Sequence, residues 1–302
     1  MLSRRHIRLK VMQSLYSYFS KKEDDIELSV KSMSVHINQV QDLYYLVFSL
    51  LIEIIKYSDR FLENAKKKHI PSIVDLNPNK RFSKNNYTLQ LLNNDILLEK
   101  TNSLLHVWID NDHDIISKLF KKIYRSSIYS LYIQNQDQDL SIDQKFIINV
   151  LNDYVLNDEL THHILEEHSI YWLDDLPFVT AIIIYNIKSN IIVCPPSVFK
   201  DNTDKYFTLD LFRETIVNNK FYEDIIVNIA ENWDLDRIAL MDKILLKMAF
   251  TEILNMKDLP VKVSMNEYIE ISKYYSTKKS KSFVNGILDK AVKQFYRDER
   301  IK

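Results

Sequence analysis

Glycine is almost absent from this chain, with Gly286 the only one in 302 residues. The phosphate-binding loops of P-loop and dinucleotide-binding enzymes need several glycines, because only glycine leaves the backbone free to bend and to approach a phosphate closely. The chain therefore cannot form such a loop. Gly286 also falls inside a predicted helix, where glycine costs roughly 1 kcal/mol relative to alanine. We expect something to require a position without a side chain there.

Cysteine, proline and long apolar runs are scarce as well. Cys194 is the only cysteine, which rules out an intrachain disulfide and is typical of a reducing cytosol. Low glycine and proline contents disfavour an all-β fold, whose turns use both residues. The most apolar stretches, Leu43–Ile55 and Phe178–Cys194, are shorter than the roughly 20 residues of a membrane span. We expect a soluble, cytoplasmic protein with no membrane partner.

The charged residues are unevenly distributed, although the formal net charge is only −1. Residues 1–22 contain no acidic side chain, and residues 272–302 contain nine Lys or Arg against three acids. Residues 134–176 instead contain ten acids and one base. Basic ends around an acidic middle indicate a local site for a polyanion. For any single run taken alone, ordinary solvated helix faces are the favoured explanation.

Apolar residues recur with helical spacing along most of the chain, which predicts an all-α fold. Ser264 and Glu267 have the spacing of a capping box and so predict a helix that begins there. The helices on which the functional argument depends are expected at Arg4–Phe19, Asp25–Ile37, Gln41–Lys67, Phe221–Asn232, Asp236–Met256 and Ser280–Tyr296.

The predicted last helix has two faces. Its apolar arc is continuous, while Lys279, Gly286 and Lys290 fall within about 60° of one another on another face, together with Lys293. Phe283 stands at the border between the faces. Cations for phosphate, an aromatic ring for a base and room for close approach are what single-stranded RNA requires. The alternative is that Gly286 lets a neighbouring helix come close while the lysines are merely solvated.

The predicted first helix carries Arg4, Arg5 and Arg8 on the same side as its apolar residues. Burying three unpaired guanidinium groups would be prohibitive. We therefore expect the first turns to extend beyond the core and to present the arginines beside the positive end of the helix dipole, where phosphate binds. A frayed terminus without function is the alternative.

Two acidic features could suggest catalysis. Glu252 lies on a core-facing stripe and has no companion base at helical spacing. We therefore expect a structural carboxylate that accepts hydrogen bonds from the backbone start of the helix opening at Ser264 or from Asn266. His162 and His163 stand four residues before Glu166 and Glu167, yet this order does not match the His-Glu-x-x-His zinc pattern. We expect surface ion pairs there, with no catalytic residue, no metal and no cofactor.

Several motifs together resemble the NusB transcription antitermination family. The first is Ser-Arg-Arg-His-Ile-Arg at residues 3–8, followed by Gln-Ser-Leu-Tyr at 13–16. The C-terminal third resembles the family more closely, with Met-Asp-Lys-Ile-Leu from Met241, Leu-Pro-Val-Lys-Val from Leu259 and Phe-Val-Asn-Gly from Phe283. The order and spacing of these elements cover residues 205–297, and a weaker likeness covers 1–20.

The resemblance implies a helical bundle of the NusB type that binds boxA-type leader RNA. It also implies the ribosomal protein NusE as partner, and an RNA polymerase antitermination complex that sustains ribosomal RNA transcription. It places Asp242 in the contact with NusE. Carried over residue by residue, the RNA-binding positions of the family fall on Arg4, Arg5, Arg8, Tyr16, Lys279, Ser280 and Phe283, and the helical phase adds Gly286 and Lys290.

The chain departs from the family in length, since members are commonly about half as long. We expect residues 1–40 and 205–302 to form the NusB-like core and 41–204 to be a helical insertion. Position 279, often acidic in relatives, is lysine here, which should strengthen phosphate attraction. The alternatives are an RNA-modification enzyme or accessory module with a NusB-like domain, and a helical docking scaffold. The role of the insertion, the oligomeric state, the RNA sequence preferred and any RNA contact of the basic loop 66–84 stay open.

Overall fold

The computed structural model of the chain describes residues 1–109, 114–230 and 237–301. All regular structure in these ranges is helical, which confirms the all-α prediction. The predicted helices Phe221–Asn232 and Asp236–Met256 correspond to α14 (Asn219–Ile229) and α15 (Leu240–Asn255). Their inner ends fall on residues 231–236, outside the described residues.

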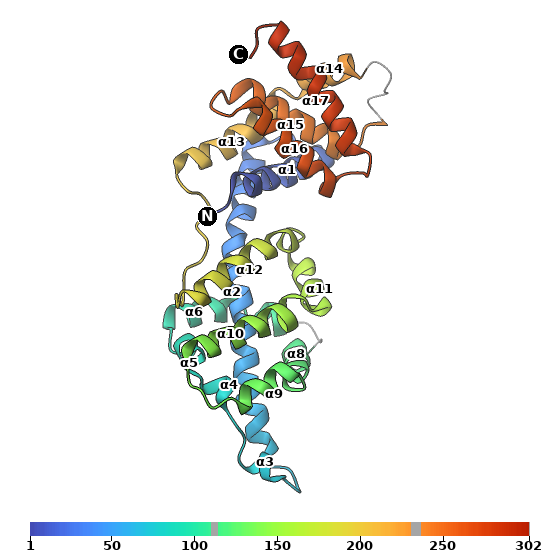
Figure 1. Cartoon of the computed structure of the whole chain (residues 1–302). Helices are drawn as coiled ribbons and strands as arrows, with labels where there is room; N and C mark the ends of the chain where they lie inside the picture. The colour runs from blue at the N-terminus through green and yellow to red at the C-terminus, as the bar shows by residue number, and fades with distance from the viewer. Residues whose placement is uncertain (110–113, 231–236, 302) are drawn as a thin grey trace. The chain divides into compact units, whose positions relative to one another are not determined.

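The chain divides into two compact units, residues 1–37 with 197–302 and residues 38–196. The sequence suggested changes at 40/41 and 204/205, a few residues further along. Unit 1 contains α1 (Arg4–Lys21), the start of α2 (Ile26–Ala65), α13 (Asn202–Val217), α14, α15, α16 (Val261–Tyr275) and α17 (Ser280–Arg297). Within it α15, α16 and α17 pack against one another, and α1 packs on α13 and α15 (Figure 1).

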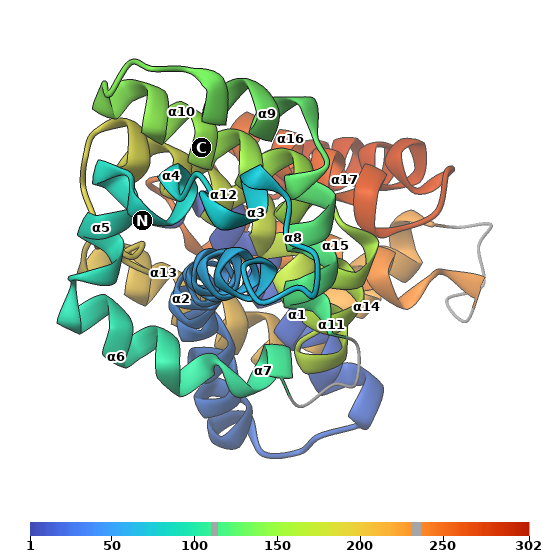
Figure 2. The same cartoon turned by 90° about the horizontal axis from the view of Figure 1, so that it is seen from below.

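Unit 2 is built around the second part of α2. Its other helices are α3 (Ile73–Leu76), α4 (Arg81–Lys84), α5 (Asn86–Leu92), α6 (Asp95–Leu104), α7 (His106–Ile109), α8 (Ile115–Tyr124), α9 (Ser127–Gln134), α10 (Leu140–Val150), the π-helix η1 (Leu151–Leu156), α11 (Glu159–His168) and α12 (Trp172–Lys188). In Figure 2 the α2 helix is seen end-on, with helices of unit 2 on several sides of it.

The helix α2 is continuous where the sequence predicted two helices separated by a break after Ile37. No glycine or proline interrupts residues 26–65, so the backbone hydrogen bonds run on through the polar Asn38. Its second part is held by neighbours in unit 2. The indole of Trp108 donates to the carbonyl of Leu46 at 3.1 Å, and the ring of Phe120 meets that of Phe61 edge-on.

The first helix has clear start and stop signals. The hydroxyl of Ser3 accepts the amide hydrogen bond of His6, which caps a donor that the helix leaves unpaired. At the other end Lys22 adopts a left-handed conformation with φ 51°, and the amide of Glu23 donates to the carbonyl of Tyr18 at 3.1 Å. The helix that presents the arginines is therefore fixed at both ends.

The predicted capping box at Ser264 is not formed. The helix α16 begins at Val261, after Pro260, because proline suits the position just before or at the start of a helix. Ser264 is consequently one turn inside the helix, where it is fully buried. Its hydroxyl and the carboxylate of Glu267 are then free for tertiary contacts.

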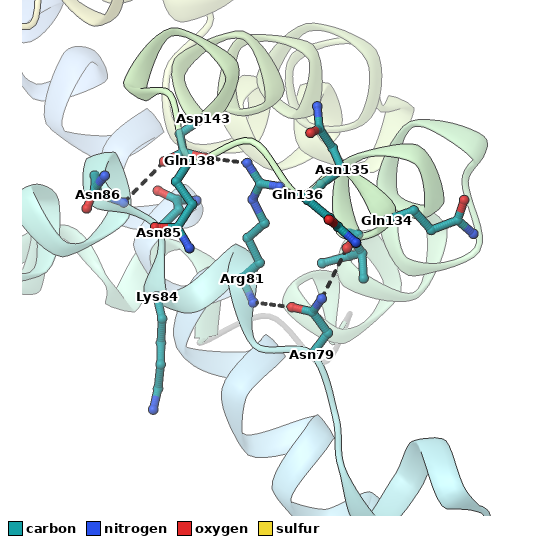
Figure 3. Close-up of a pocket in the computed structure, with 11 residues that line it drawn as sticks. Asn79, Arg81, Lys84, Asn85, Asn86, Gln134, Asn135, Gln136, Gln138 and Asp143 are labelled. Carbon is teal, nitrogen blue, oxygen red and sulfur yellow. Dashed lines mark hydrogen bonds and ion pairs between the residues drawn. The ribbon is translucent and has the colours of Figure 1, made fainter.

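In unit 2, Arg81 fastens α4 to the loop between α9 and α10. Its guanidinium lies over the ring of Tyr132, 4.4 Å from the centroid, and donates to the carbonyls of Tyr132, Asn135 and Asp137. The Tyr132 hydroxyl donates to the buried Asp143 at 2.7 Å. Figure 3 shows Arg81, Asn135 and Asp143 among the residues around a pocket of about 580 Å³ that is lined mostly by amide side chains. Because the guanidinium of Arg81 already donates hydrogen bonds to carbonyls of the chain itself, we interpret its role as structural.

Taken singly, none of the described helices is long and apolar enough to cross a membrane. The consecutive helices α11 and α12, bent by 118° where they join, meet the length and composition criteria only as a pair.

Candidate nucleic-acid interface

The three arginines of α1 have different environments, and Arg8 is buried. Its side chain is 3 % exposed, and Nε and Nη2 donate to the two carboxylate oxygens of Glu252 at 2.9 and 2.6 Å. The expectation that all three guanidinium groups lie beyond the core is therefore wrong for Arg8. The physical argument against burial applied to an unpaired cation, and Glu252 supplies the missing partner.

Glu252 accepts two further hydrogen bonds in addition to those of Arg8. The hydroxyl of Ser264 donates at 2.5 Å and that of Tyr268 at 2.9 Å, and no part of Glu252 is exposed. The structural role is confirmed, but Ser264 donates through its hydroxyl and not through the backbone of a helix start, which lies at Val261. The pairing with Arg8 was missed. Burial opposes the charge of Arg8, but the bond to Glu252 and nearby carboxylates hold its pKa above the ordinary value.

Arg4 and Arg5 remain at the surface, each beside one carboxylate. Arg4 contacts Asp204 at 3.2 Å and lies over the ring of Phe207. Arg5 donates twice to Glu267, both times at 2.7 Å, and its side chain is 54 % exposed. These arginines are held in fixed positions while a large part of the Arg5 guanidinium still faces solvent. A phosphate could approach Arg5 without unfolding the helix.

The start of α17 presents a group of lysines and one buried serine. Lys278, Lys279 and Lys281 are exposed and form no ion pair with the residues that the structure describes. Ser280, by contrast, is 1 % exposed, and its hydroxyl donates to Asp242 at 2.7 Å. The structure thus gives Ser280 an internal partner and leaves the lysines around it free.

Asp242, the residue expected to face the protein partner, is 5 % exposed. Its Oδ2 atom accepts from Ser280, while Oδ1 is buried and accepts no hydrogen bond from the described part of the chain. An unpaired carboxylate oxygen of this kind is costly, by about 1–3 kcal/mol. Asp242 therefore links α15 to the first turn of α17 and keeps one acceptor unused.

Gly286 lies in the middle of α17, as predicted, and it is exposed. A Cβ atom placed there would meet no atom within 4 Å. No neighbouring helix therefore comes close at this position, and the packing explanation for the glycine is wrong. Phe283 is half-buried one turn before it, and Lys290 and Lys293 are exposed one and two turns after it. The stripe of cations, aromatic ring and open space faces solvent.

Helix α1 and the start of α17 are brought into one electrostatic neighbourhood by α16. The pKa of Glu270 is lowered first by its bond to Lys273, and also by the charges of Lys281 and Arg5. Both cations must therefore lie near this carboxylate. Tyr16 is 45 % exposed and follows Arg5 by three helical turns, which places it on the same face of α1, roughly 16 Å away.

The sequence missed some members of this surface. Lys281 was given no role from the sequence, although the excess of basic residues after residue 272 includes it. Glu267 was assigned to a helix cap, and its partnership with Arg5 joins positions 262 residues apart. Asp204 carried no local signal that would have connected it with Arg4.

The Arg5–Glu267 pair predicts a specific acid dependence of stability. Its bond to Arg5 lowers the pKa of Glu267, so the pair stabilises the fold at pH values above the ordinary glutamate pKa. That contribution is lost as the pH falls through the lower pKa of the folded state. Glu267→Gln should therefore reduce the free energy of unfolding by about 0.5–1 kcal/mol at pH 7. The difference from wild type should vanish in acid, as urea titrations at both pH values will show. Asp289→Asn, an exposed carboxylate on α17, serves as control, and an equal difference at all pH values would contradict the prediction.

The histidine-rich segment forms local contacts. His163 lies 3.4 Å from Glu167, and the Nε2 atom of His162 lies 2.6 Å from the carbonyl of Leu156. Among the described residues no group of three His, Cys, Asp or Glu side chains could hold a metal ion. These contacts are ordinary interactions of a helix surface.

Comparison with known proteins decides the family. Residues 198–293 match the model of the NusB family. Transcription antitermination protein NusB of Alkaliphilus oremlandii is 40 % identical over 94 residues, which make up 31 % of this chain and 68 % of that protein. The chain belongs to the NusB family. The resemblance found in the motifs of the C-terminal third is thereby confirmed, while the weaker likeness over residues 1–20 lies outside the family match.

Two further relatives with the same name set the extent of the similarity. The protein of Salinibacter ruber is 46 % identical over 90 residues, 30 % of this chain and 56 % of that protein. The protein of Chloroherpeton thalassium is 44 % identical over 97 residues, 32 % of this chain and 46 % of that protein. The chain thus spans about half the length of these relatives. No solved structure matches the chain.

The family match begins at residue 198, beside the point at which the chain returns to unit 1 at Ser197. The NusB similarity therefore covers α13 to α17, with Gly286 and the lysines before it, and unit 2 lies outside it.

Proposed function

We propose that this protein is a noncatalytic transcription antitermination factor that acts in the cytoplasm. It binds boxA-type leader RNA together with ribosomal protein NusE, within an RNA polymerase antitermination complex that sustains ribosomal RNA transcription. Membership of the NusB family supports the antitermination role. The solvent-facing cations of α1 and α17 support RNA as the ligand, since RNA phosphates are attracted by lysine and arginine.

The proposed RNA surface consists of groups that are exposed or half-buried. Arg5 and Tyr16 contribute from α1, and Lys279, Phe283, Gly286 and Lys290 from α17, with Arg4 at the edge. Arg8 is excluded because its guanidinium is buried against Glu252. Ser280 acts indirectly in this proposal, by holding the first turn of α17 on Asp242.

The contact with NusE is proposed to involve Asp242. Its unused Oδ1 atom gives a reason why a partner would be favoured there, since a donor from the partner would remove the cost of an unpaired acceptor.

One observation carries the RNA proposal, namely the open space at Gly286. Mid-helix glycine lowers helix stability, and here no packing of the chain explains it. A nucleic-acid backbone that approaches the helix closely would explain it. The proposal thus assigns the stability cost of Gly286 to ligand binding.

Gly286→Ala should therefore separate stability from binding. We expect the free energy of unfolding to rise by about 1 kcal/mol, because alanine favours the helix and meets no atom. We expect RNA affinity to fall by five- to a hundredfold, because a methyl group that overfills a close contact costs about 1–3 kcal/mol. Urea titration and fluorescence anisotropy with a boxA-bearing RNA measure the two effects.

Asn285→Ala provides the matched control, since Asn285 is exposed on the same helix but lies off the stripe. It should leave RNA affinity within twofold of wild type. If Gly286→Ala stabilises the protein and binds RNA as wild type does, the glycine is not part of an RNA contact.

A further inference from the structure

A second group of cations lies in unit 2, on α8. Lys118, Lys121, Lys122 and Arg125 are separated by three, one and three residues, which places all four within about 100° of arc on one helix face. All four are exposed. The opposite face of α8 is buried and apolar, with Leu119, Phe120 and Ile123 in the core. The cations are thus displayed on a firmly anchored helix.

Only one of these four cations has an acidic partner within the described ranges. Lys122 forms an ion pair with Asp158, whose carboxylate also accepts from the amides of Leu160 and Thr161 at the start of α11. Lys118, Lys121 and Arg125 form no such pair. Like charges three or four residues apart on a helix repel one another by a few tenths of a kcal/mol. We therefore expect this row of cations to bind an external anion, which relieves a repulsion that the chain itself leaves in place.

An independent feature faces the row across a pocket of about 810 Å³. The π-helix η1 contributes Asp153 and Tyr154 to its lining, and the start of α11 contributes Glu159. π-helical turns are rare and often occur at functional sites, because the extra residue redirects side chains. Tyr154 is half-buried and Asp153 is exposed. The pocket therefore combines three cations without an ion-pair partner among the described residues, the Lys122–Asp158 pair, an aromatic ring and two further carboxylates.

This combination fits one class of ligand best. Cations match a phosphodiester, an aromatic ring stacks on a base, and a carboxylate accepts a hydrogen bond from a ribose 2′-hydroxyl. An acidic peptide would meet the cations but would offer neither a base for Tyr154 nor a ribose hydroxyl for the carboxylates of Asp153 and Glu159. We propose that this pocket of unit 2 binds single-stranded RNA, with Lys118, Lys121 and Arg125 on the phosphates and Tyr154 on a base. This site rests on the proposed RNA-binding function and extends that function to a separate set of residues.

The first experiment removes the cations in the full chain. Salt-dependent titrations of a 20-nucleotide single-stranded RNA without boxA should show that Lys118→Ala/Lys121→Ala/Arg125→Ala weakens binding at low salt by at least about tenfold. The slope of log K against log salt should fall by about 2, at roughly 0.7 for each lost phosphate contact. Lys31→Ala/Lys145→Ala/Lys188→Ala, which removes three other exposed lysines, should change affinity by less than twofold.

The same titrations on an Arg5→Ala/Phe283→Leu background separate this proposal from the function proposed for unit 1. If unit 1 does not recognise boxA RNA, the changes Arg5→Ala and Phe283→Leu leave the RNA affinity unchanged, while the α8 triple variant still weakens binding. If the triple variant binds RNA with unchanged affinity and slope on both backgrounds, the α8 site is overturned. All three side chains are exposed, so we expect the triple variant to fold as the wild type does. An unchanged circular dichroism spectrum will show that the fold is intact.

A second variant addresses the ribose. Asp153→Asn/Glu159→Gln should reduce the preference for RNA over DNA of the same sequence about fivefold, because an amide accepts less strongly than a carboxylate. If the variant instead binds RNA and DNA more tightly by the same factor, the carboxylates only repel phosphate, and the assignment of RNA as the specific ligand is overturned.

Discussion

Glu252→Ala is expected to destabilise unit 1 by about 3–5 kcal/mol, because it removes the hydrogen-bonded partner of the buried Arg8 guanidinium and leaves only Glu267, 3.9 Å away, as counter-charge. Arg8 is 3 % exposed and Glu252 is fully buried, so water cannot replace the lost partner. The hydroxyls of Ser264 and Tyr268 lose their acceptor in the same change. Few single substitutions in a domain of this size approach that magnitude.

Hydrogen exchange followed by mass spectrometry measures the effect in the unit concerned. Amides of α1 and α15 should lose protection in Glu252→Ala, while those of α8 and α10 in unit 2 keep theirs. Asp289→Ala, which removes an exposed carboxylate of α17, should have almost no effect.

The double replacement Arg8→Met/Glu252→Leu tests the cause. Since no charge is then left unpaired, we expect it to recover most of the lost stability. A Glu252→Ala variant within 1 kcal/mol of wild type would show that the pair is not buried as described.

Phe283→Leu is expected to weaken RNA binding by about 1–3 kcal/mol, or roughly five- to a hundredfold. Stacking of a base on an aromatic ring is worth that amount. Leucine keeps an apolar group of similar bulk at this half-buried position, so the fold should be retained while the flat ring is lost. The slope of affinity against salt should stay unchanged, because no phosphate contact is removed.

Tyr296→Leu supplies the matched control on the same helix. Tyr296 is 49 % exposed and lies about 140° around α17 from Phe283, away from the stripe. Its replacement should leave RNA affinity unaltered. Equal losses for the two variants would mean that the ring of Phe283 has no specific part in binding.

The sequence was informative wherever local pattern decides structure. Helical periodicity predicted the all-α fold and placed Gly286 inside a helix, and both are confirmed. The motifs from Met241 to Lys290 pointed to the NusB family because their residue types and spacing can be recognised in the sequence without knowledge of the tertiary structure. The continuity of α2 was missed because the polar residues after Ile37 resemble a break, although nothing there prevents a helix.

Long-range pairing was beyond the reach of the sequence. Arg8 and Glu252 are both charged residues on core-facing stripes, and the sequence led to a separate explanation for each. We expected Arg8 to be exposed and Glu252 to accept local hydrogen bonds. Their positions are 244 residues apart, so no helical period connects them. The same holds for Arg5 with Glu267. In unit 2 the π-helix leaves no compositional trace, and the pocket beside α8 could not be foreseen.

The central claim is that unit 1 binds boxA-type RNA together with NusE. A fluorescence anisotropy titration of a boxA-bearing RNA and a scrambled control, with and without NusE and at two salt concentrations, tests it most directly. The account predicts tighter binding of the boxA RNA, a further gain when NusE is present, and weaker binding at the higher salt. Weak and equal binding of both RNAs that does not respond to NusE would contradict it.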